Sequence, residues 1–429
     1  MDATLSHSEL AGSVYAPPSK SYTHRAIFAS AYDSAAVVRR PLISADTRAS
    51  IGAVALFGAD ATLGEETIEM VGFDGTPHVP ENVVDCANSG TTMRLALGTA
   101  GLVDGTTVLT GDSSLRSRPQ GPMLDAIEQL GGRAESTRGN GQAPIVVSGW
   151  NGGGSVDVPG DVSSQFITSL LMAGALTDEG IEITLSTPLK SAPYVDVTLD
   201  VLEAFGVDAS ETQSGYSVPG NQTYDLGGEE YTVPGDFSSA SYLLAAGSIG
   251  GDPVEVHGVF PGPQGDAAIV AILDRMGADI EWDRTDGVLT VRESNLDGTE
   301  VDVGDTPDLL PTIAVLGAVA GGDTEMTNCE HVRYKETDRV TAMAESLERM
   351  GASVTEERDR LVVHGSETNL HGATVDGRGD HRIVMALSIA GLAATGETTV
   401  TGAEHVDVSF PGFFEVMADL GATVHLDGA

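Results

Sequence analysis

Lysine is scarce in this chain: Lys20, Lys190 and Lys335 are the three lysines among 429 residues, against 63 aspartates and glutamates. The formal net charge of −41 argues against nucleic acid, which needs a basic footprint, and against anionic membranes. The acidic residues are dispersed and 41% of the residues are apolar, so we expect a folded protein. A dispersed acidic surface with so little lysine suggests a protein that works in molar salt, where charge repulsion is screened.

Cysteine is rarer still, and Cys86 and Cys329 lie far apart in no Cys-x-x-Cys spacing, which speaks against a zinc site or a disulfide framework. The chain has no metal-ligand spacing and no nucleotide fingerprint, so we expect neither a metal nor a bound cofactor. The longest nearly apolar run, residues 309–320, is too short to span a bilayer, and the first residues do not form a signal peptide. We expect a cytoplasmic protein.

A short phrase of the form apolar-x-x-apolar-Gly recurs along the chain every 70 to 75 residues. Its glycines are Gly58, Gly131, Gly206, Gly277, Gly351 and Gly421. The phrase predicts a helix that ends in a glycine C-cap. An Ala-Gly pair that closes an apolar run recurs with the same period, so each unit holds two helices with strands around them. Six such units predict an α/β protein, and the length favours two domains of three units each.

Polar motifs recur at one place in this repeat, the loop that opens the first helix. They are Ser19-Lys20-Ser21, Asn88 to Arg94, Ser163 to Gln165, Ser238-Ser239, Pro307-Asp308 and Gly379 to Arg382. Helix N-termini offer free N–H groups and a positive dipole end, so they suit an anionic ligand. Ser, Thr, Asn and Asp are also good N-caps, which explains the hydroxyls. It does not explain why Lys20, Arg25, Arg94 and Arg382 cluster at the same helix starts.

Two carboxylates have open interpretations. Glu336 lies in the segment Lys335–Arg339 before a helical stretch, where either Thr337 or Asp338 would cap the helix. Spacing alone favours solvated surface there, whereas the functional alternative makes Glu336 a proton donor between cations. Asp308 is either an N-cap or a general base.

Two loops add weaker signals. Arg116 and Arg118 precede a helix and suit a phosphate or a carboxylate, although surface arginines are common. Residues 190–194 read as a loop in which Tyr194 could donate a hydrogen bond through its hydroxyl.

Together these motifs resemble those of the 5-enolpyruvylshikimate-3-phosphate synthases (3-phosphoshikimate 1-carboxyvinyltransferases) over essentially the whole chain. The motifs that match are Ser19-Lys20-Ser21 to Arg25, Asn88 to Arg94, Arg118-Pro119, Ser163 to Gln165, Gln264-Gly265-Asp266, Pro307-Asp308, Lys335 to Arg339 and Asp380 to Arg382. Each is weak alone, but eight in the family's order are highly specific.

The resemblance implies a two-domain clamp, each domain built from three βαβαββ-type units. The implied domains are 1–18 with 234–429, and 19–233, with the substrate cleft between them. The implied reaction transfers the enolpyruvyl group of phosphoenolpyruvate to the 5-hydroxyl of shikimate 3-phosphate and releases phosphate, in the pathway to chorismate and the aromatic amino acids. The partners would be these two small molecules, and we expect a monomer.

The resemblance also implies the roles of individual residues. The catalytic ones would be Asp308 as base, Glu336 as acid, and Lys20. Shikimate 3-phosphate would be held by Lys20, Ser21, Arg25, Ser163, Ser164, Gln165, Ser191, Tyr194, Asp308 and Lys335. Phosphoenolpyruvate would be held by Lys20, Gly90, Arg118, Gln165, Arg339 and Arg382.

The chain departs from the family pattern at three positions. His331 stands where many members have an asparagine that touches the shikimate phosphate, and Leu95 follows Arg94 where some have proline. Val408 precedes Ser409-Phe410-Pro411 where the family has a lysine, so one cation of the phosphoenolpyruvate site is missing from that position. Arg333 and His405 are candidates to replace it.

Two other functions compete with this interpretation. The sister enzyme that transfers enolpyruvate to UDP-N-acetylglucosamine usually carries a reactive cysteine in the loop before Arg-Pro, and residues 111–118 contain none. A non-catalytic acidic repeat protein would bind partners across its surface, but it would not need basic residues at helix starts.

Overall fold

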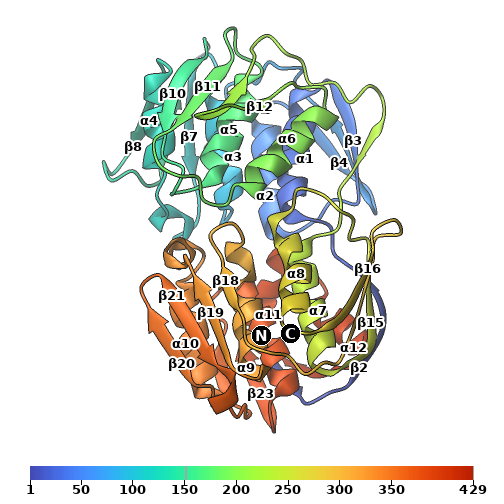
Figure 1. Cartoon of the computed structure of the whole chain (residues 1–429). Helices are drawn as coiled ribbons and strands as arrows, with labels where there is room; N and C mark the ends of the chain where they lie inside the picture. The colour runs from blue at the N-terminus through green and yellow to red at the C-terminus, as the bar shows by residue number, and fades with distance from the viewer. Residues whose placement is uncertain (150–151, 429) are drawn as a thin grey trace. The chain divides into compact units, whose positions relative to one another are not determined.

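The computed structural model describes residues 1–149 and 152–428. The chain divides into two compact units: unit 1 comprises Met1–Pro17 and Pro234–Ala429, and unit 2 comprises Pro18–Val233 (Figure 1). It enters unit 2 after strand β2 (Leu10–Tyr15) and leaves it after strand β14 (Glu230–Thr232). Each unit is described by itself below.

Unit 2 repeats a strand-helix-strand-helix-hairpin pattern three times. The first copy uses β14 as its first strand and continues with α1 (Lys20–Tyr32), β3 (Ala35–Arg39), α2 (Ala45–Leu56), β4 (Asp60–Leu63) and β5 (Thr67–Val71). The second contains β6 (Val84–Asp85), α3 (Gly90–Gly101), β7 (Thr106–Thr110), η1 (Leu115–Ser117), α4 (Gly121–Gln129), β8 (Arg133–Ser136) and β9 (Ile145–Ser148). The third contains β10 (Gly154–Val158), α5 (Ser164–Gly174), β11 (Ile181–Leu185), α6 (Pro193–Ala204), β12 (Ser210–Glu211) and β13 (Gly215–Val218).

Unit 1 uses the same pattern. The fourth copy begins with β2 and continues with α7 (Phe237–Gly250), β15 (Gly251–His257), η2 (Gly265–Ala267), α8 (Ala268–Arg275), β16 (Asp279–Asp283) and β17 (Val288–Arg292). The fifth contains β18 (Glu300–Asp302), η3 (Pro307–Leu309), α9 (Leu310–Val319), β19 (Asp323–Thr327), η4 (Glu330–Tyr334), α10 (Arg339–Arg349), β20 (Val354–Glu357), β21 (Arg360–His364) and η5 (Gly365–Glu367). The sixth contains β22 (Thr374–Asp376), α11 (His381–Ala393), β23 (Glu397–Thr401), η6 (Ala403–Val408), α12 (Phe413–Asp419), β24 (Thr423–Asp427) and β1 (Asp2–Ser6).

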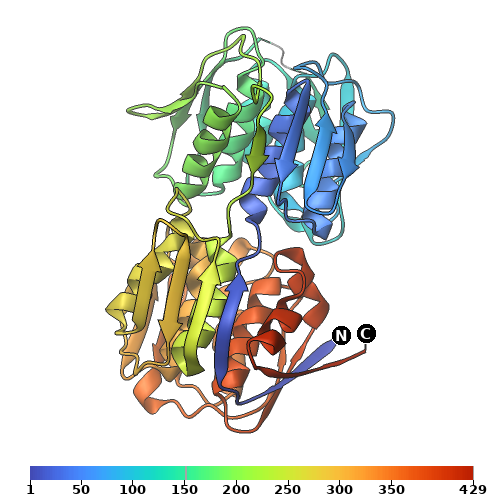
Figure 2. The same cartoon turned by 90° about the vertical axis from the view of Figure 1, so that its right-hand side faces the viewer.

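The described strands form six four-stranded sheets, one for each copy. In each sheet the first strand is parallel to the second, and the remaining pairs are antiparallel. The N-terminal strands complete two sheets of unit 1: β2 pairs with β15, and β1 lies between β23 and β24. Figure 2 shows β2 in blue beside β15 in yellow-green. The predicted six-unit α/β fold is thus confirmed.

The six predicted glycine C-caps are also confirmed. Helices α2, α4, α6, α8, α10 and α12 each end two residues before one of these glycines. The glycines adopt φ values from +72° to +113°, a backbone region that side chains with a Cβ rarely enter. The repeated phrase therefore marks the end of the second helix in every copy.

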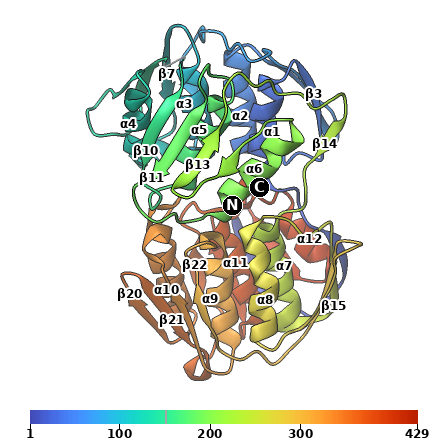
Figure 3. The same ribbon diagram turned by 45° about the horizontal axis from the view of Figure 1, so that its top comes forward.

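The first helix of each copy is buried. In unit 1, α7, α9 and α11 contact one another, and Figure 3 shows them between the β20–β21 hairpin and β15. Gly247 lets α7 approach its sheet, because a Cβ there would lie 2.4 Å from Cγ1 of Val291. None of the helices in residues 1–149 and 152–428 has the length and apolar character of a membrane span.

Candidate active site

The predicted site residues fall on both units, and most of them lie at the starts of buried helices. Unit 2 carries Lys20, Ser21, Arg25, Gly90, Arg118, Ser163, Ser164, Gln165, Ser191 and Tyr194. Unit 1 carries Asp308, Lys335, Glu336, Arg339 and Arg382.

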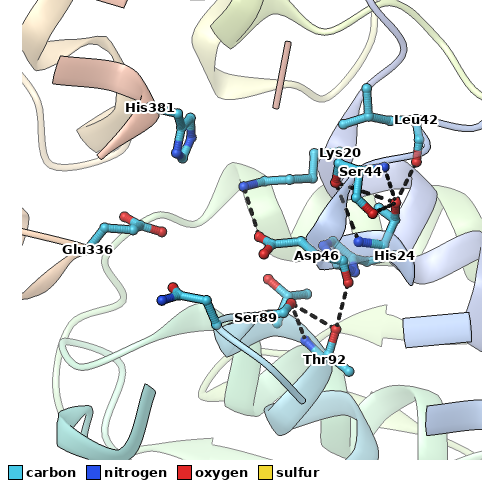
Figure 4. Close-up of polar contacts among 12 residues, drawn as sticks. Lys20, His24, Leu42, Ser44, Asp46, Ser89, Thr92, Glu336 and His381 are labelled. Carbon is cyan, nitrogen blue, oxygen red and sulfur yellow. Dashed lines mark hydrogen bonds and ion pairs between the residues drawn. The ribbon is translucent and has the colours of Figure 1, made fainter. Parts of the chain in front are cut away.

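Lys20 is the first residue of α1, and its ammonium is paired with a carboxylate. Its Nζ lies 3.3 Å from Oδ2 of Asp46 in the first turn of α2, and the two side chains are only 16% and 13% exposed (Figure 4). Ser44 caps α2 by accepting a hydrogen bond from the Thr47 amide, so the helix start that carries Asp46 has a defined geometry. The pair places a half-buried cation at two adjoining helix starts.

Behind this pair runs a buried chain of hydroxyls that joins α1, α2 and α3. Nδ1 of His24 lies 2.7 Å from Oγ of Ser50, which lies 2.7 Å from Oγ1 of Thr92. Thr92 donates to Oγ of Ser89 at 2.8 Å and also lies 3.3 Å from the carbonyl oxygen of Asp46 (Figure 4). Burial, with Lys20 and Arg25 nearby, lowers the pKa of His24 well below its ordinary value, so the imidazole is neutral. This row of hydrogen bonds fixes the backbone of Asp46, because Thr92 also contacts the Asp46 carbonyl oxygen.

Gly90 opens α3 and allows two guanidinium groups to approach it. A Cβ at Gly90 would lie 3.2 Å from Nη1 of Arg118 and equally close to Nη1 of Arg94. Arg118 donates through Nη2 to Oδ1 of Asn88 at 2.7 Å, which fixes its orientation. Two arginines beside a helix N-terminus form a suitable site for a phosphate or a carboxylate.

Gln165, in the first turn of α5, is held from both ends. Its Oε1 accepts from Nη1 of Arg94 at 2.6 Å, and its Nε2 donates to Oγ1 of Thr91 at 2.9 Å. Ser163 is the N-cap of α5, where its hydroxyl accepts a hydrogen bond from the backbone N–H of Gln165. Arg94 thus connects α3 to α5, a role that the sequence pattern alone did not assign to it.

Arg25 is buried and contacts three helices. It donates to the carbonyl oxygens of Ser21 and Tyr194 and to the hydroxyls of Thr168 and Thr198, at 2.8 to 3.2 Å. Burial lowers its pKa to about 10, so the guanidinium is still charged at neutral pH. Four of its five N–H groups are spent on these protein contacts, which fix the backbone of Ser21 and Tyr194.

The segment that precedes α6 corrects one expectation. Tyr194 was expected in a loop, but it lies in the first turn of α6, which begins at Pro193. Proline is favoured at the first helical position because its missing N–H has no intrahelical partner there. Ser191 is buried and has φ +58°, a strained conformation for serine.

In unit 1 the guanidinium group of Arg339 is hydrogen-bonded to three carboxylates. Arg339, which is 1% exposed, donates from Nη1 to Asp308, from Nη2 to Glu336 and from Nε to Asp380, each at 2.7 Å. Burial alone would lower the pKa of Arg339, but its three carboxylate partners raise it further, so the net pKa lies above the ordinary value.

Arg382 and Asp380 complete this cluster at the start of α11. Arg382 donates from Nη2 to the other oxygen of Asp308 at 2.8 Å, so Asp308 is bound by an arginine on each side. Asp380 is the N-cap of α11 and accepts from the Arg382 amide at 2.9 Å. The structure thus brings together four residues predicted from sequence: Asp308, Glu336, Arg339 and Arg382.

Asp266, on η2, is a buried carboxyl near this cluster. Its Oδ2 accepts from the Ser238 hydroxyl, and its Oδ1 has no hydrogen-bond partner among the described residues. Burial raises the pKa of Asp266 to about 7, Asp308 adds to the rise, and Arg382 opposes it. Its motif was recognised in the sequence, but no role was assigned to it.

The structure shows which residue of the Lys335–Arg339 segment caps α10, Thr337 or Asp338. Asp338 is the N-cap of α10 and accepts from the Thr341 amide at 3.1 Å. Nη1 of Arg333 lies 3.0 Å from Oδ2 of Asp338 and 2.7 Å from Oε1 of Glu356. The charge of Arg333 is therefore paired with these two carboxylates. Lys335 follows η4 directly.

Val408 ends η6, a segment that contacts α11. His405 of this segment lies beside the loop before α11, since a Cβ at Gly379 would be 3.8 Å from its Nε2. His405 thus lies beside the helix start that carries Arg382, whereas Arg333 is paired with Asp338 and Glu356. Within the described ranges no three His, Cys, Asp or Glu side chains are arranged to hold a metal ion.

Comparison with known proteins gives one consistent family. The family model of EPSP synthase (3-phosphoshikimate 1-carboxyvinyltransferase) matches residues 6–417. A 3-phosphoshikimate 1-carboxyvinyltransferase of Halobacterium salinarum is 65% identical over 98% of this chain and 99% of its own length, and that of Halorubrum lacusprofundi is 61% identical over both full lengths. Among solved structures, EPSP synthase from Acinetobacter baumannii superposes with a TM-score of 0.85 at 26% identity, over 100% of each chain. The chain therefore belongs to the EPSP synthase (3-phosphoshikimate 1-carboxyvinyltransferase) family.

Proposed function

We propose that the protein transfers the enolpyruvyl group of phosphoenolpyruvate to the 5-hydroxyl of shikimate 3-phosphate and releases inorganic phosphate. The observation that carries the proposal is the cluster in which Asp308 lies between Arg339 and Arg382 while Glu336 shares Arg339. A base, an acid and two cations for an anionic substrate are the groups that this reaction needs.

In the proposed reaction Asp308 takes the proton of the 5-hydroxyl as its oxygen attacks C2 of phosphoenolpyruvate. Glu336 gives a proton to the methylene carbon, which becomes a methyl group in a tetrahedral adduct. Loss of a methyl proton and departure of phosphate then restore the double bond on the new ether. Lys20 would balance charge on the substrates, and the fixed donors of both units would hold two anions close enough to react.

The proposal assigns ligands by unit. For shikimate 3-phosphate the ligands in unit 2 would be Ser21, Ser163, Ser164, Gln165, Ser191 and Tyr194, with Arg25 placing the backbone of two of them, and Lys335 would add a charge from unit 1. For phosphoenolpyruvate the guanidinium groups of Arg118, Arg339 and Arg382 would be the main contacts, beside Gly90, Gln165 and Lys20. Because the reaction joins the two substrates, both sets must act on the same pair.

The sister reaction on UDP-N-acetylglucosamine is less well supported. Both cysteines are buried, and burial raises the pKa of the Cys329 thiol to about 12 and that of Cys86 further, so neither is a reactive thiolate. The deciding experiment measures phosphate release from phosphoenolpyruvate in molar KCl with each acceptor separately. We expect turnover with shikimate 3-phosphate only; turnover with the UDP-sugar alone, or with neither, would refute the proposal. We further propose a cytoplasmic monomer, which size-exclusion chromatography with light scattering would test for its oligomeric state.

A further inference from the structure

Arg339 has almost no hydrogen-bonding capacity left for a ligand. A guanidinium has five N–H groups. Nε binds Asp380, Nη1 binds Asp308, and Nη2 binds both Glu336 and the second oxygen of Asp380. Four N–H groups are therefore committed to carboxylates, and one remains. An anion that binds Arg339 with two hydrogen bonds must take the place of at least one of these carboxylates.

The three carboxylates differ in how firmly they are fixed. Asp380 is fully buried, binds Arg339 through both oxygens and also caps α11 through the Arg382 amide. Asp308 and Glu336 are 16% and 25% exposed, so their side of the guanidinium is the one that solvent and ligands reach. Exchange at Arg339 would thus release Glu336 or Asp308 and leave Asp380 in place.

The ion pair also conflicts with the proposed chemistry of Glu336. A carboxylate bound to a guanidinium is kept in its charged form, because the cation stabilises the negative charge. A general acid must carry a proton before it can donate one. Glu336 at 2.7 Å from Nη2 of Arg339 is therefore held in the wrong protonation state for the role proposed for it.

We propose that the carboxylate of phosphoenolpyruvate displaces Glu336 from Arg339, so that binding of this substrate allows Glu336 to take up the proton it later donates. This inference rests on the proposed function. The same exchange would loosen Asp308 from Nη1 of Arg339 while its bond to Arg382 stays, and the loss of one cation contact makes Asp308 a stronger base. Substrate binding would thereby prepare both the acid and the base, and neither would be active while Arg339 holds it.

The charged groups around Glu336 are consistent with proton uptake. Arg339 of its own segment is the partner from which Glu336 is displaced, and Lys335 is the neighbour of Glu336 in sequence. From η3 comes Asp308, and from the α11 start come Asp380, His381 and Arg382, with His381 lying 3.7 Å from Asp380. On release, Glu336 would lose the contact with its cation, and the substrate carboxylate would add a negative charge nearby; both changes favour its protonated form.

The test is the number of protons taken up on binding, measured by titration calorimetry of the full chain in two buffers of different ionisation enthalpy. The ligand is phosphoenolpyruvate alone, at constant molar KCl and neutral pH. We expect wild-type protein to take up about one proton more than Glu336→Gln, which has nothing to protonate. The difference between the two proteins excludes protons exchanged by the ligand phosphate.

A matched control is Glu345→Gln, which removes another arginine-paired glutamate, bound to Arg378, from α10, the helix that follows the Glu336 segment. It should take up as many protons as wild type. Glu336→Gln should also bind phosphoenolpyruvate several-fold more tightly, because a competing carboxylate is gone, whereas damage to the site would weaken binding. Equal proton uptake in wild type and Glu336→Gln would overturn the inference.

The outcome separates the inference from the function on which it rests. Normal turnover with shikimate 3-phosphate but no proton uptake in wild type would refute the exchange and keep the proposed function. Absence of turnover with that acceptor would refute the proposed function whatever the calorimetry gives. If Glu336→Gln does not fold, Glu336→Ala gives the same comparison with wild type, because it also lacks the carboxyl group that would take up the proton.

Discussion

Lys20 and Asp46 form an ion pair in which Nζ lies 3.3 Å from Oδ2, and both side chains are largely shielded from solvent. The pair connects the first turns of α1 and α2, the two helices of the first copy, across 26 residues of sequence. In a chain with a net charge of −41, this lysine is held in place where unit 2 also presents the Gly90 helix start and its two arginines.

The first prediction concerns this lysine. Lys20→Met should raise KM for the anionic substrates roughly ten- to hundredfold, since a charge-assisted contact is worth about 1.5–3 kcal/mol. Steady-state kinetics at fixed salt would measure it. Arg292→Met is the control, because it removes an equal charge from an exposed pair with Asp279. Unchanged KM for both substrates would remove Lys20 from the site.

The second prediction concerns the base. Asp308→Asn should keep the fold and substrate binding but lower kcat by about 10²–10⁴-fold, because an amide cannot accept the hydroxyl proton. Stopped assays over a range of pH would show the loss. Asp419→Asn on the exposed face of α12 should have wild-type kcat. Near-normal turnover of Asp308→Asn at any pH would exclude Asp308 as the base.

The third prediction tests the position where the family has a lysine. Val408→Lys should lower KM for phosphoenolpyruvate several-fold by adding a charge-assisted contact, reduced by solvent and salt. KM for shikimate 3-phosphate should stay the same. Val71→Lys, on the exposed surface of unit 2, adds the same charge elsewhere and should change neither KM. If Val408→Lys also changes neither, His405 is the residue to test next.

The fourth prediction concerns salt. With 63 acidic and 22 basic residues, repulsion should destabilise the folded state at low ionic strength, where the Debye length is about 30 Å at 0.01 M. The melting temperature, followed by circular dichroism, should rise markedly from dilute buffer to molar KCl. A melting temperature that does not change with salt would contradict a protein adapted to molar salt and would leave the family assignment intact.

The fifth prediction follows from the buried carboxyl of Asp266. Its pKa rises from about 3.9 in the unfolded chain to about 7 in the fold, chiefly by burial, so the folded state holds the proton more tightly. Its charge therefore costs no stability below about pH 4, and the cost grows up to about pH 7. Asp266→Asn lacks this cost, because an amide does not titrate.

Urea unfolding in molar salt would measure it. Relative to wild type, Asp266→Asn should gain about 2–3 kcal/mol of unfolding free energy between pH 5 and pH 8. Asp274→Asn, an exposed change in the same unit, should show no such pH dependence. A constant difference between Asp266→Asn and wild type across this range would mean that Asp266 is charged at both pH values.

The features that the sequence predicted are those with local causes. Gly58 and its five counterparts end helices because only glycine enters the left-handed region at low cost, and that requirement is visible in the chain itself. Ser163 and Asp380 cap helices for an equally local reason, as their short side chains reach the first free amides. The order of the motifs then indicated the family.

The tertiary structure alone decided which of these local features meet. The sequence left Asp308 open as a cap or a base, and only the packing of η3, α10 and α11 sets it between Arg339 and Arg382. Asp46 drew no attention in the sequence because its partner Lys20 is on another helix, and the burial of Asp266 depends on contacts with α7. Charge pairing and desolvation depend on distances between segments, and those distances follow from how the six units pack, not from the order of residues within any one of them.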